Sequence, residues 1–223
     1  MAFEELHEFQ GLTMDSDLMV FKEFEIKLST NNRIEQIKKR LFEFGFMQTK
    51  DVIQEDYYFD IGIKLFEKDE RLRIRFEYTA PYKLNYCQWT WKGPRPTQNT
   101  DVREDHSIDI PVDQAKDLQI LLEKLGFEVL VAFRKVRTRY KLDDSEIEIE
   151  FDEQVTLLHE SKEIPMGSFL QVSLESELPE NTNIKELDKK LWDDYVIQLG
   201  FSGKDRINKT YVEIALELSK REK

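Results

Sequence analysis

Cysteine, histidine and long apolar runs are all scarce in this chain of 223 residues. The single cysteine, Cys87, excludes a disulfide framework and a zinc site built from several cysteines. The histidines at positions 7, 106 and 159 lack the spacing of metal ligands, and we expect His106 to be a surface residue. No apolar run approaches the ~18 residues of a membrane span, and the N-terminus lacks the pattern of a signal peptide. We therefore expect a cytoplasmic protein without a membrane-spanning segment.

Positive charge is also in deficit. The chain has 33 basic and 45 acidic residues, which gives a formal net charge of −12 at pH 7. This balance argues against non-specific nucleic-acid binding, which needs a basic surface. An anionic substrate would have to be attracted by a local cluster of basic side chains, against the field of the whole chain.

The remaining composition is that of a globular protein, with 40% hydrophobic residues, 15 phenylalanines and 8 tyrosines. No repeat, low-complexity tract or interdomain linker is evident. We expect an N-terminal extension over residues 1–18 and a single domain over residues 19–223.

Alternating apolar and polar residues indicate many strands, and 3.6-residue patterns indicate helices between them. We expect strands at 19–29, 52–60, 71–78, 85–92, 101–110, 127–133, 134–142, 146–155 and 168–177. We expect helices that start near 32, 113, 183 and 206 and end near 45, 125, 199 and 220. Strands with inserted helices make this an α+β protein.

The polar faces of several of these strands carry charges of a single sign. Three expected strands are basic on that face, with Arg73 and Arg75, with Lys92, and with Lys135, Arg137 and Arg139. Another is acidic, with Glu146, Glu148, Glu150 and Asp152. The first strand is mixed, because Glu23, Glu25 and Lys27 share one face. On its own, this Glu-x-Glu-x-Lys run is more typical of a solvated strand face.

Two arrangements fit this alternation. An open sheet would expose the charged faces to water. A wide barrel with its apolar faces outward, under helices, would instead enclose a channel with a basic and an acidic wall. Such an interior needs a highly charged ligand, because isolated buried charges are costly. A triphosphate bridged to Mg²⁺ or Mn²⁺ suits both walls. Periodicity does not distinguish the two arrangements.

Seven segments, in order along the chain, resemble the motifs of the CYTH superfamily, the triphosphate tunnel metalloenzymes. They are Glu23-x-Glu25-x-Lys27, Gln54-x-Asp56-x-Tyr58-Phe59-Asp60, Leu72-Arg73-Ile74-Arg75, Trp91-Lys92-Gly93-Pro94, Lys135-x-Arg137-x-x-Tyr140, Phe151-Asp152 and Asn208-Lys209-Thr210-Tyr211. The resemblance extends from about residue 20 to residue 214. It implies a single-domain, eight-stranded antiparallel β-barrel, or tunnel, with covering helices.

The resemblance also implies roles for particular residues. The substrate-binding residues would be Lys27, Arg73, Arg75, Lys92, Lys135, Arg137 and Lys209. Glu23, Glu25 and Lys27 would be the catalytic residues. The ligands of Mg²⁺ or Mn²⁺ would be Glu23, Glu25, Asp152 and Glu175.

One segment departs from the family pattern. The last strand of such proteins usually carries a second Glu-x-Glu pair, whereas here Ser173 stands at the first position and leaves only Glu175. This change could weaken metal binding, favour one ion over two, or mark a protein that binds without turnover.

Three functions therefore stay open. The motifs look closer to class IV adenylate cyclases, which would convert ATP to cyclic AMP and pyrophosphate. The alternative is a triphosphatase acting on inorganic triphosphate, thiamine triphosphate or a nucleoside triphosphate. The second alternative is a non-catalytic binder of nucleotide or polyphosphate. The resemblance alone is also consistent with a homodimer.

Overall fold

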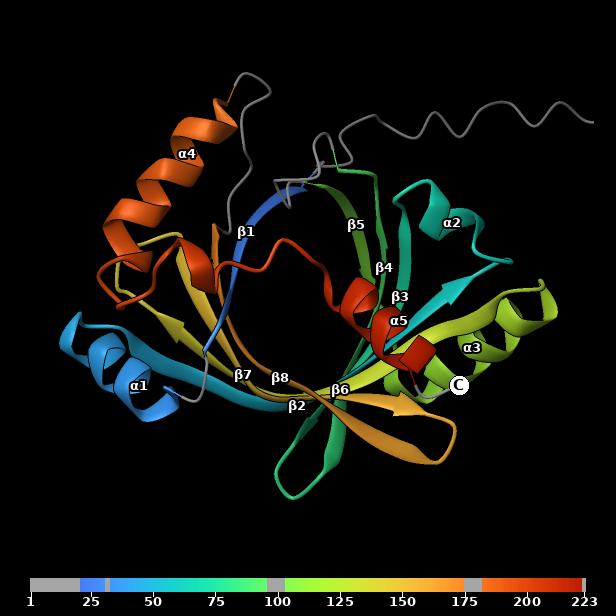
Figure 1. Cartoon of the computed structure of the whole chain (residues 1–223). Coiled ribbons are helices and arrows are strands. Elements are labelled where there is room, and N and C mark those ends of the chain that lie inside the picture. The colour runs from blue at the N-terminus through green and yellow to red at the C-terminus, as the bar shows by residue number, and fades with distance from the viewer. Residues whose placement is uncertain (1–20, 31–32, 96–102, 175–181, 222–223) are drawn as a thin grey trace, which may run out of the picture.

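Eight antiparallel strands close into a barrel, which confirms the tunnel fold (Figure 1). The computed structural model describes residues 21–30, 33–95, 103–174 and 182–221. In chain order the strands are β1 (Phe21–Ser29), β2 (Met47–Asp60), β3 (Arg71–Thr79), β4 (Lys83–Lys92), β5 (Arg103–Asp109), β6 (Glu128–Lys141), β7 (Ile147–His159) and β8 (Lys162–Leu174). Around the barrel they follow the order β1-β5-β4-β3-β2-β6-β7-β8.

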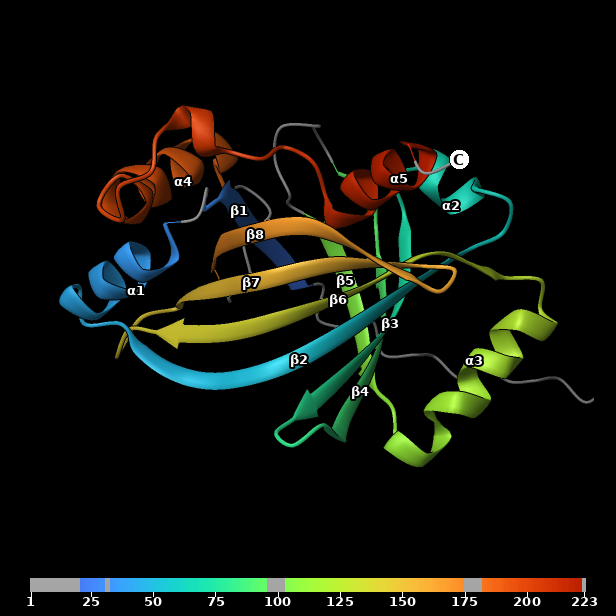
Figure 2. The ribbon, with the colours of Figure 1, turned by 60° about the horizontal axis from the view of Figure 1, so that its bottom comes forward.

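The helices cover separate parts of this barrel. In chain order they are α1 (Ile34–Glu43), α2 (Lys64–Glu67), α3 (Ala115–Lys124), α4 (Ile184–Leu191) and α5 (Tyr211–Arg221). Figures 1 and 2 show α1 and α4 together on one side of the barrel and α3 on the other. Within the described residues, no helix combines the length and apolarity needed to cross a membrane.

The apolar face of β1 points outward. Phe24, Ile26 and Leu28 are buried in a cluster with residues of α1 and α4. Their neighbours Glu25 and Lys27 therefore point into the barrel, because successive strand side chains alternate. On the opposite side, Ile74 of β3 packs in a cluster with residues of α3. The barrel thus keeps its apolar core outside, under helices, and its charged face inside.

The predicted break between residues 133 and 134 is wrong, since 128–141 forms one strand. The segment has no glycine or proline to end a strand. Its composition changes because its surroundings change along the strand. Phe133 is buried in a cluster with Tyr211 and Val212 of α5, whereas Arg137 lines a cavity.

Two helix boundaries also differ from the prediction. The helix expected at 183–199 forms α4 only to Leu191 and continues as a wider helical turn over Trp192–Val196. The last helix begins at Tyr211, because the Glu213 carboxylate accepts hydrogen bonds from the Thr210 amide and hydroxyl.

Candidate functional site

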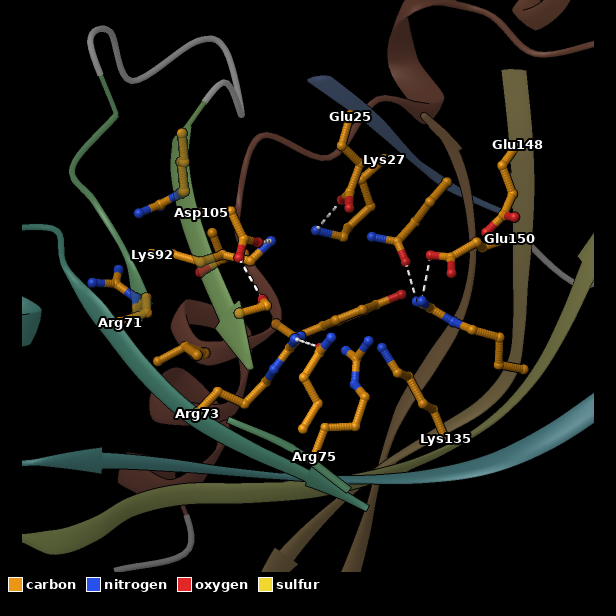
Figure 3. A pocket seen from close by; sticks show the side chains of 18 of the residues that line it. Glu25, Lys27, Arg71, Arg73, Arg75, Lys92, Asp105, Lys135, Glu148 and Glu150 are labelled. Carbon is orange, nitrogen blue, oxygen red and sulfur yellow. Dashed lines mark hydrogen bonds and ion pairs between the residues drawn. The ribbon is translucent and has the colours of Figure 1, made fainter. Parts of the chain in front are cut away.

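The barrel encloses a cavity of about 660 Å³ whose walls are strongly basic (Figure 3). Ten basic and four acidic side chains of the described residues line it. The basic ones are Lys27, Arg71, Arg73, Arg75, Lys92, Arg103, Lys135, Arg137, Arg139 and Lys141, and the acidic ones are Glu25, Asp105, Glu148 and Glu150. The cavity therefore attracts an anion although the chain has a net charge of −12.

The arginines of β3 differ in how their charge is balanced. The Arg75 guanidinium donates to both Asp56 carboxylate oxygens, at 2.6 and 2.9 Å. Burial lowers the pKa of Arg75, but the Asp56 charge outweighs this and raises it. Arg73 donates only to neutral oxygens, of Gln88 at 3.2 Å and Thr90 at 3.0 Å, and its Nε has no hydrogen-bond partner among the described residues. Arg73 is thus a buried cation that forms no hydrogen bond or ion pair with a carboxylate in the part of the chain that the structure describes, although its charge helps to lower the pKa of Asp56.

A second bidentate pair lies on the next two strands of the barrel, β6 and β7. Arg137 donates to Asp152 Oδ1 at 2.6 Å and Oδ2 at 2.7 Å. The Tyr211 hydroxyl also donates to Asp152 Oδ2, at 2.6 Å. Burial alone would raise the pKa of Asp152, but the charge of Arg137 lowers it below its usual value. Burial, together with the Asp152 charge, raises the pKa of Tyr211 well above its usual value, so its hydroxyl stays protonated.

Two lysines lie near the ring of Tyr211. Lys27 Nζ is 4.6 Å and Lys135 Nζ is 5.3 Å from the ring centroid. Lys135 is only 2% exposed, and its Nζ lies 3.4 Å from Asp56. Burial, with the like charges of Arg137 and Arg75, lowers the pKa of Lys135 to about 7. This lysine can therefore gain a proton near neutral pH when an anion enters the cavity.

Carboxylates gather where β1, β8 and β7 run side by side. Ser173 of β8 pairs in register with Glu25 on one side and with Glu148 on the other. Glu25 Oε1 lies 3.0 Å from Lys27 Nζ, yet it is buried without a hydrogen-bond partner among the described residues. Within those residues, no three carboxylate, histidine or cysteine side chains form a metal-binding group.

The structure brings most of the predicted site together. The predicted residues that line the cavity are Glu25, Lys27, Arg73, Arg75, Lys92, Lys135 and Arg137. Glu175 lies outside the described residues, and of Glu23 only the backbone is described, paired with Arg103.

Two predicted residues lie outside the cavity. Both oxygens of Asp152 accept hydrogen bonds from Arg137, which lines the cavity, so Asp152 holds that side chain in place, and its role as a metal ligand stays a prediction. Lys209 also lies outside the cavity. Its side chain is 54% exposed and donates to both Glu217 carboxylate oxygens, at 2.6 and 2.8 Å.

Several residues that line the cavity were not among the predicted site residues. Arg71 and Arg139 share strand faces with predicted residues, and that alternation was the signal for both. Arg103 was detectable only from its place on an expected strand. It donates to the backbone oxygens of Asp69 and Gly93, at 2.6 and 2.9 Å. Nothing in the local pattern shows that Tyr211 reaches from a helix to the strand that carries Asp152.

Comparison with known proteins agrees with the fold. The model of the CYTH domain matches residues 22–211. The chain belongs to the CYTH family. A Methanocaldococcus jannaschii relative, described as a "putative adenylate cyclase", is 31% identical over 200 residues, which cover 88% of this chain and 98% of the relative.

Solved structures share the CYTH fold of this chain. A Pyrococcus horikoshii protein is 26% identical with a TM-score of 0.68, over 88% of this chain and 99% of the other. A Vibrio parahaemolyticus "putative adenylate cyclase" is 18% identical with a TM-score of 0.67, over 87% and 98%. A Hippeastrum "putative adenylyl cyclase" described as having a dominant triphosphatase activity is 17% identical with a TM-score of 0.59, over 88% and 95%. The last two likenesses concern the fold alone.

Proposed function

We propose that this CYTH-family protein is a metal-dependent enzyme that acts on a triphosphate held inside the barrel. The observation that carries the proposal is the cavity of about 660 Å³ with ten basic side chains in an otherwise acidic protein. Arg73 supports it most directly, because a buried guanidinium without an acidic partner is costly until an anion binds. A triphosphate supplies that charge together with many acceptor oxygens.

The acidic wall suits a hard divalent cation. Mg²⁺ is commonly held by one or two carboxylates together with the phosphate oxygens of the substrate. Glu25, whose buried Oε1 forms an ion pair with Lys27 but has no hydrogen-bond partner among the described residues, and Glu148, on the far side of β8, are the described residues that would hold it. Glu23 remains a predicted ligand. When bound, Mg²⁺ or Mn²⁺ would neutralise charge on the phosphate oxygens.

The protein's own contribution is binding and electrostatic stabilisation. Arg73 and Arg137 would donate to phosphate oxygens, and Lys27 and Lys135 would add charge where negative charge develops. Because Asp56 and Asp152 fix Arg75 and Arg137 through two hydrogen bonds each, these guanidinium groups need little rearrangement when the substrate enters.

We infer cyclisation of ATP to cyclic AMP as the first reaction to test, supported by the relative that is 31% identical. The ribose 3′-hydroxyl would attack the α-phosphorus, and pyrophosphate would leave. Hydrolysis is the second candidate, with water attacking the terminal phosphorus to release orthophosphate. Lys135 favours neither reaction, since it adds charge in both. Serine at position 173 keeps non-catalytic binding as the remaining outcome.

The test is to incubate the protein with ATP, inorganic triphosphate or thiamine triphosphate, with Mg²⁺ or Mn²⁺, and to resolve the products. Cyclic AMP with pyrophosphate identifies a cyclase, and orthophosphate identifies a hydrolase. Tight binding without product identifies a binder. Glu25→Gln should abolish metal-dependent turnover, and an unchanged rate in this variant would contradict the metal assignment.

A further inference from the structure

Three arginines from different parts of the chain converge on Asp69, in the turn between α2 and β3. Arg95, which follows β4, donates to Asp69 Oδ2 from its amide at 3.0 Å and from Nε at 2.8 Å, and to Oδ1 from a guanidinium nitrogen at 3.0 Å. Arg71 and Arg103 donate to Oδ1 of the same carboxylate, at 3.1 and 3.3 Å. One carboxylate therefore holds side chains of β3, of β5 and of the segment after β4.

The charge of Asp69 balances two arginines of the main cavity, the one of about 660 Å³ inside the barrel. Burial tends to raise the pKa of Asp69, but hydrogen bonds from Arg95 and the charge of Arg103 lower it, so the carboxylate is ionised at neutral pH. Arg71 and Arg103 both line the cavity, and Figure 3 shows Arg71 on the same side of it as Lys92. Burial and the like charge of Arg103 lower the pKa of Arg71, whereas Asp69 raises it. Asp69 therefore lets two like charges lie together at the cavity wall.

Arg95 also reaches helix α5. Its guanidinium donates to Glu213 Oε1 at 3.0 Å. The other oxygen of Glu213 accepts from the amide and the hydroxyl of Thr210, at 2.7 and 2.9 Å, and residues 210–212 line the main cavity. Arg95 therefore joins the first turn of α5 to the side of the cavity that Asp69 supports.

Arg95 makes these contacts from outside the cavity. Among the described residues, Arg95, Asp69 and Glu213 are not part of the cavity lining. The Arg95 side chain is only 8% exposed, and its planar fork of donors is what allows it to bridge two carboxylates. A lysine carries the same charge on a single nitrogen, so it could not keep all of these hydrogen bonds.

We propose that Arg95 is a positioning residue for the triphosphate. Through Asp69 it holds the two cavity arginines in place, and through Glu213 it holds the first turn of α5. The inference rests on the proposed function, since the triphosphate must occupy the main cavity. A purely structural ion-pair network would instead stabilise the fold and leave the affinity for the triphosphate unchanged.

The experiment measures Kd for inorganic triphosphate by calorimetry without a divalent cation, and KM and kcat with Mg²⁺ for the triphosphate that is turned over. Arg95→Lys keeps the charge and loses the fork, so Kd and KM should rise about tenfold with a smaller change in kcat. The matched control is Arg134→Lys. Arg134 bridges Glu55 and Glu163, at 2.9 and 2.8 Å, outside the main cavity, so this replacement should change Kd and KM by less than about twofold.

A second pair of variants tests the contact with α5. Glu213→Asp keeps the charge but shortens the side chain, so the contact with Arg95 should be lost and Kd should rise about fivefold. Its control is Glu217→Asp on the same helix. Glu217 accepts from the exposed Lys209 outside the cavity, so Kd should stay within about twofold.

Urea unfolding separates lost affinity from lost stability, because Arg95→Lys and Arg134→Lys should lower the unfolding midpoint to a similar extent. Equal Kd values in these two variants overturn the positioning role while the proposed function stands. A rise in Arg95→Lys without one in Glu213→Asp overturns the part of the proposal that concerns α5. If the unmodified protein binds no triphosphate with or without Mg²⁺, the proposed function fails and this inference fails with it.

Discussion

The Tyr211 hydroxyl donates a hydrogen bond of 2.6 Å to Asp152, 59 residues earlier in the chain. Through Asp152 it reaches Arg137, and its ring lies beside Lys27 and Lys135. The first residue of α5 therefore contacts or positions three of the basic side chains that line the main cavity. Helix α5 therefore lines the main cavity as well as covering the barrel.

Tyr211→Phe should separate positioning from simple packing. The ring remains, but Asp152 loses one donor, and we expect about 1–2 kcal/mol less stability. Because Arg137 is held less firmly, KM for the triphosphate should rise about threefold to tenfold with a smaller change in kcat. Urea unfolding and steady-state kinetics measure the two effects. In the control Tyr195→Phe, where the structure describes no hydrogen bond to the hydroxyl, both should stay constant.

Arg73 and Arg75 are two residues apart on β3, yet their replacement should have opposite effects on stability. Arg75→Gln leaves the buried Asp56 without its bidentate partner, which should cost about 3–5 kcal/mol. Arg73→Gln removes a buried cation that has no acidic partner among the described residues, so stability should hold or rise.

Replacement of Arg73 should also weaken binding of the triphosphate. Arg73→Gln should weaken triphosphate binding by about 2 kcal/mol, roughly thirtyfold, because a charge-assisted hydrogen bond is lost. Calorimetric titration and urea unfolding on both variants provide the measurements. A large loss of stability in Arg73→Gln would show that its charge is already balanced in the empty protein.

Lys135 should make triphosphate binding depend on pH. Its pKa is about 7 in the empty protein, below the ordinary value of 10.5, so at pH 8.5 most molecules carry it neutral. A polyanion stabilises the charged form and raises this pKa, so binding takes up a proton and affinity falls as pH rises above 7.

Calorimetry at pH 8.5 in two buffers of different ionisation enthalpy measures this uptake. At that pH the phosphate groups are already fully ionised and contribute little of their own. Lys135→Met should abolish most of the uptake, and equal uptake in this variant would assign the proton to another group.

The free energy of unfolding of the empty protein should change with pH in the opposite direction to the affinity for the triphosphate. Between pH 7 and 10.5 the unfolded chain binds this proton more tightly, so Lys135 makes the empty protein more stable as pH rises.

Strand faces could be predicted from the sequence, because alternation is a local property. It predicted that Arg73 and Arg75 share one strand face and that Phe24 and Ile26 share another, and the structure places the arginines at the cavity and the apolar pair under the helices. Closure of the barrel did not follow from alternation, since an open sheet has the same period, and the closed form was expected only through the family resemblance. The split expected within residues 128–141 also came from a local pattern, because the change from apolar to basic residues was interpreted as the boundary between two strands.

Which side chains pair between strands was beyond local patterns. Asp152 shares a strand face with Glu148, and the family resemblance offered Asp152 as a metal ligand. In the structure a register shift in β6–β7 pairing lies next to Asp152, which pairs with Arg137, whereas Glu148 lines the cavity. Lys209 was misplaced for a similar reason. It precedes a helix whose direction decides whether the lysine points to the cavity or to Glu217.

Lys209→Ala tests whether Lys209 contacts the substrate. Because the side chain is exposed and bound to Glu217, we expect KM and kcat for the triphosphate within twofold of the unmodified protein. Lys92→Ala is the matched comparison. Lys92 lines the cavity, and its removal should raise KM at least tenfold. A similar rise of KM in both variants would mean that Lys209 reaches the substrate after a movement of the segment that precedes α5.

Ser173→Glu would test whether the departure at this position limits metal binding. Ser173 lies in register between Glu25 and Glu148, so the new carboxylate would stand between the two proposed ligands. A third carboxylate should lower the Mg²⁺ or Mn²⁺ concentration for half-maximal activity about tenfold. In the absence of metal it should cost about 1–3 kcal/mol of stability, since like charges are brought together in a buried place. Ser173→Gln supplies the same size without the charge and should do neither. Metal dependence that is unchanged in Ser173→Glu would place the ion elsewhere and would count against Glu25 and Glu148 as its ligands.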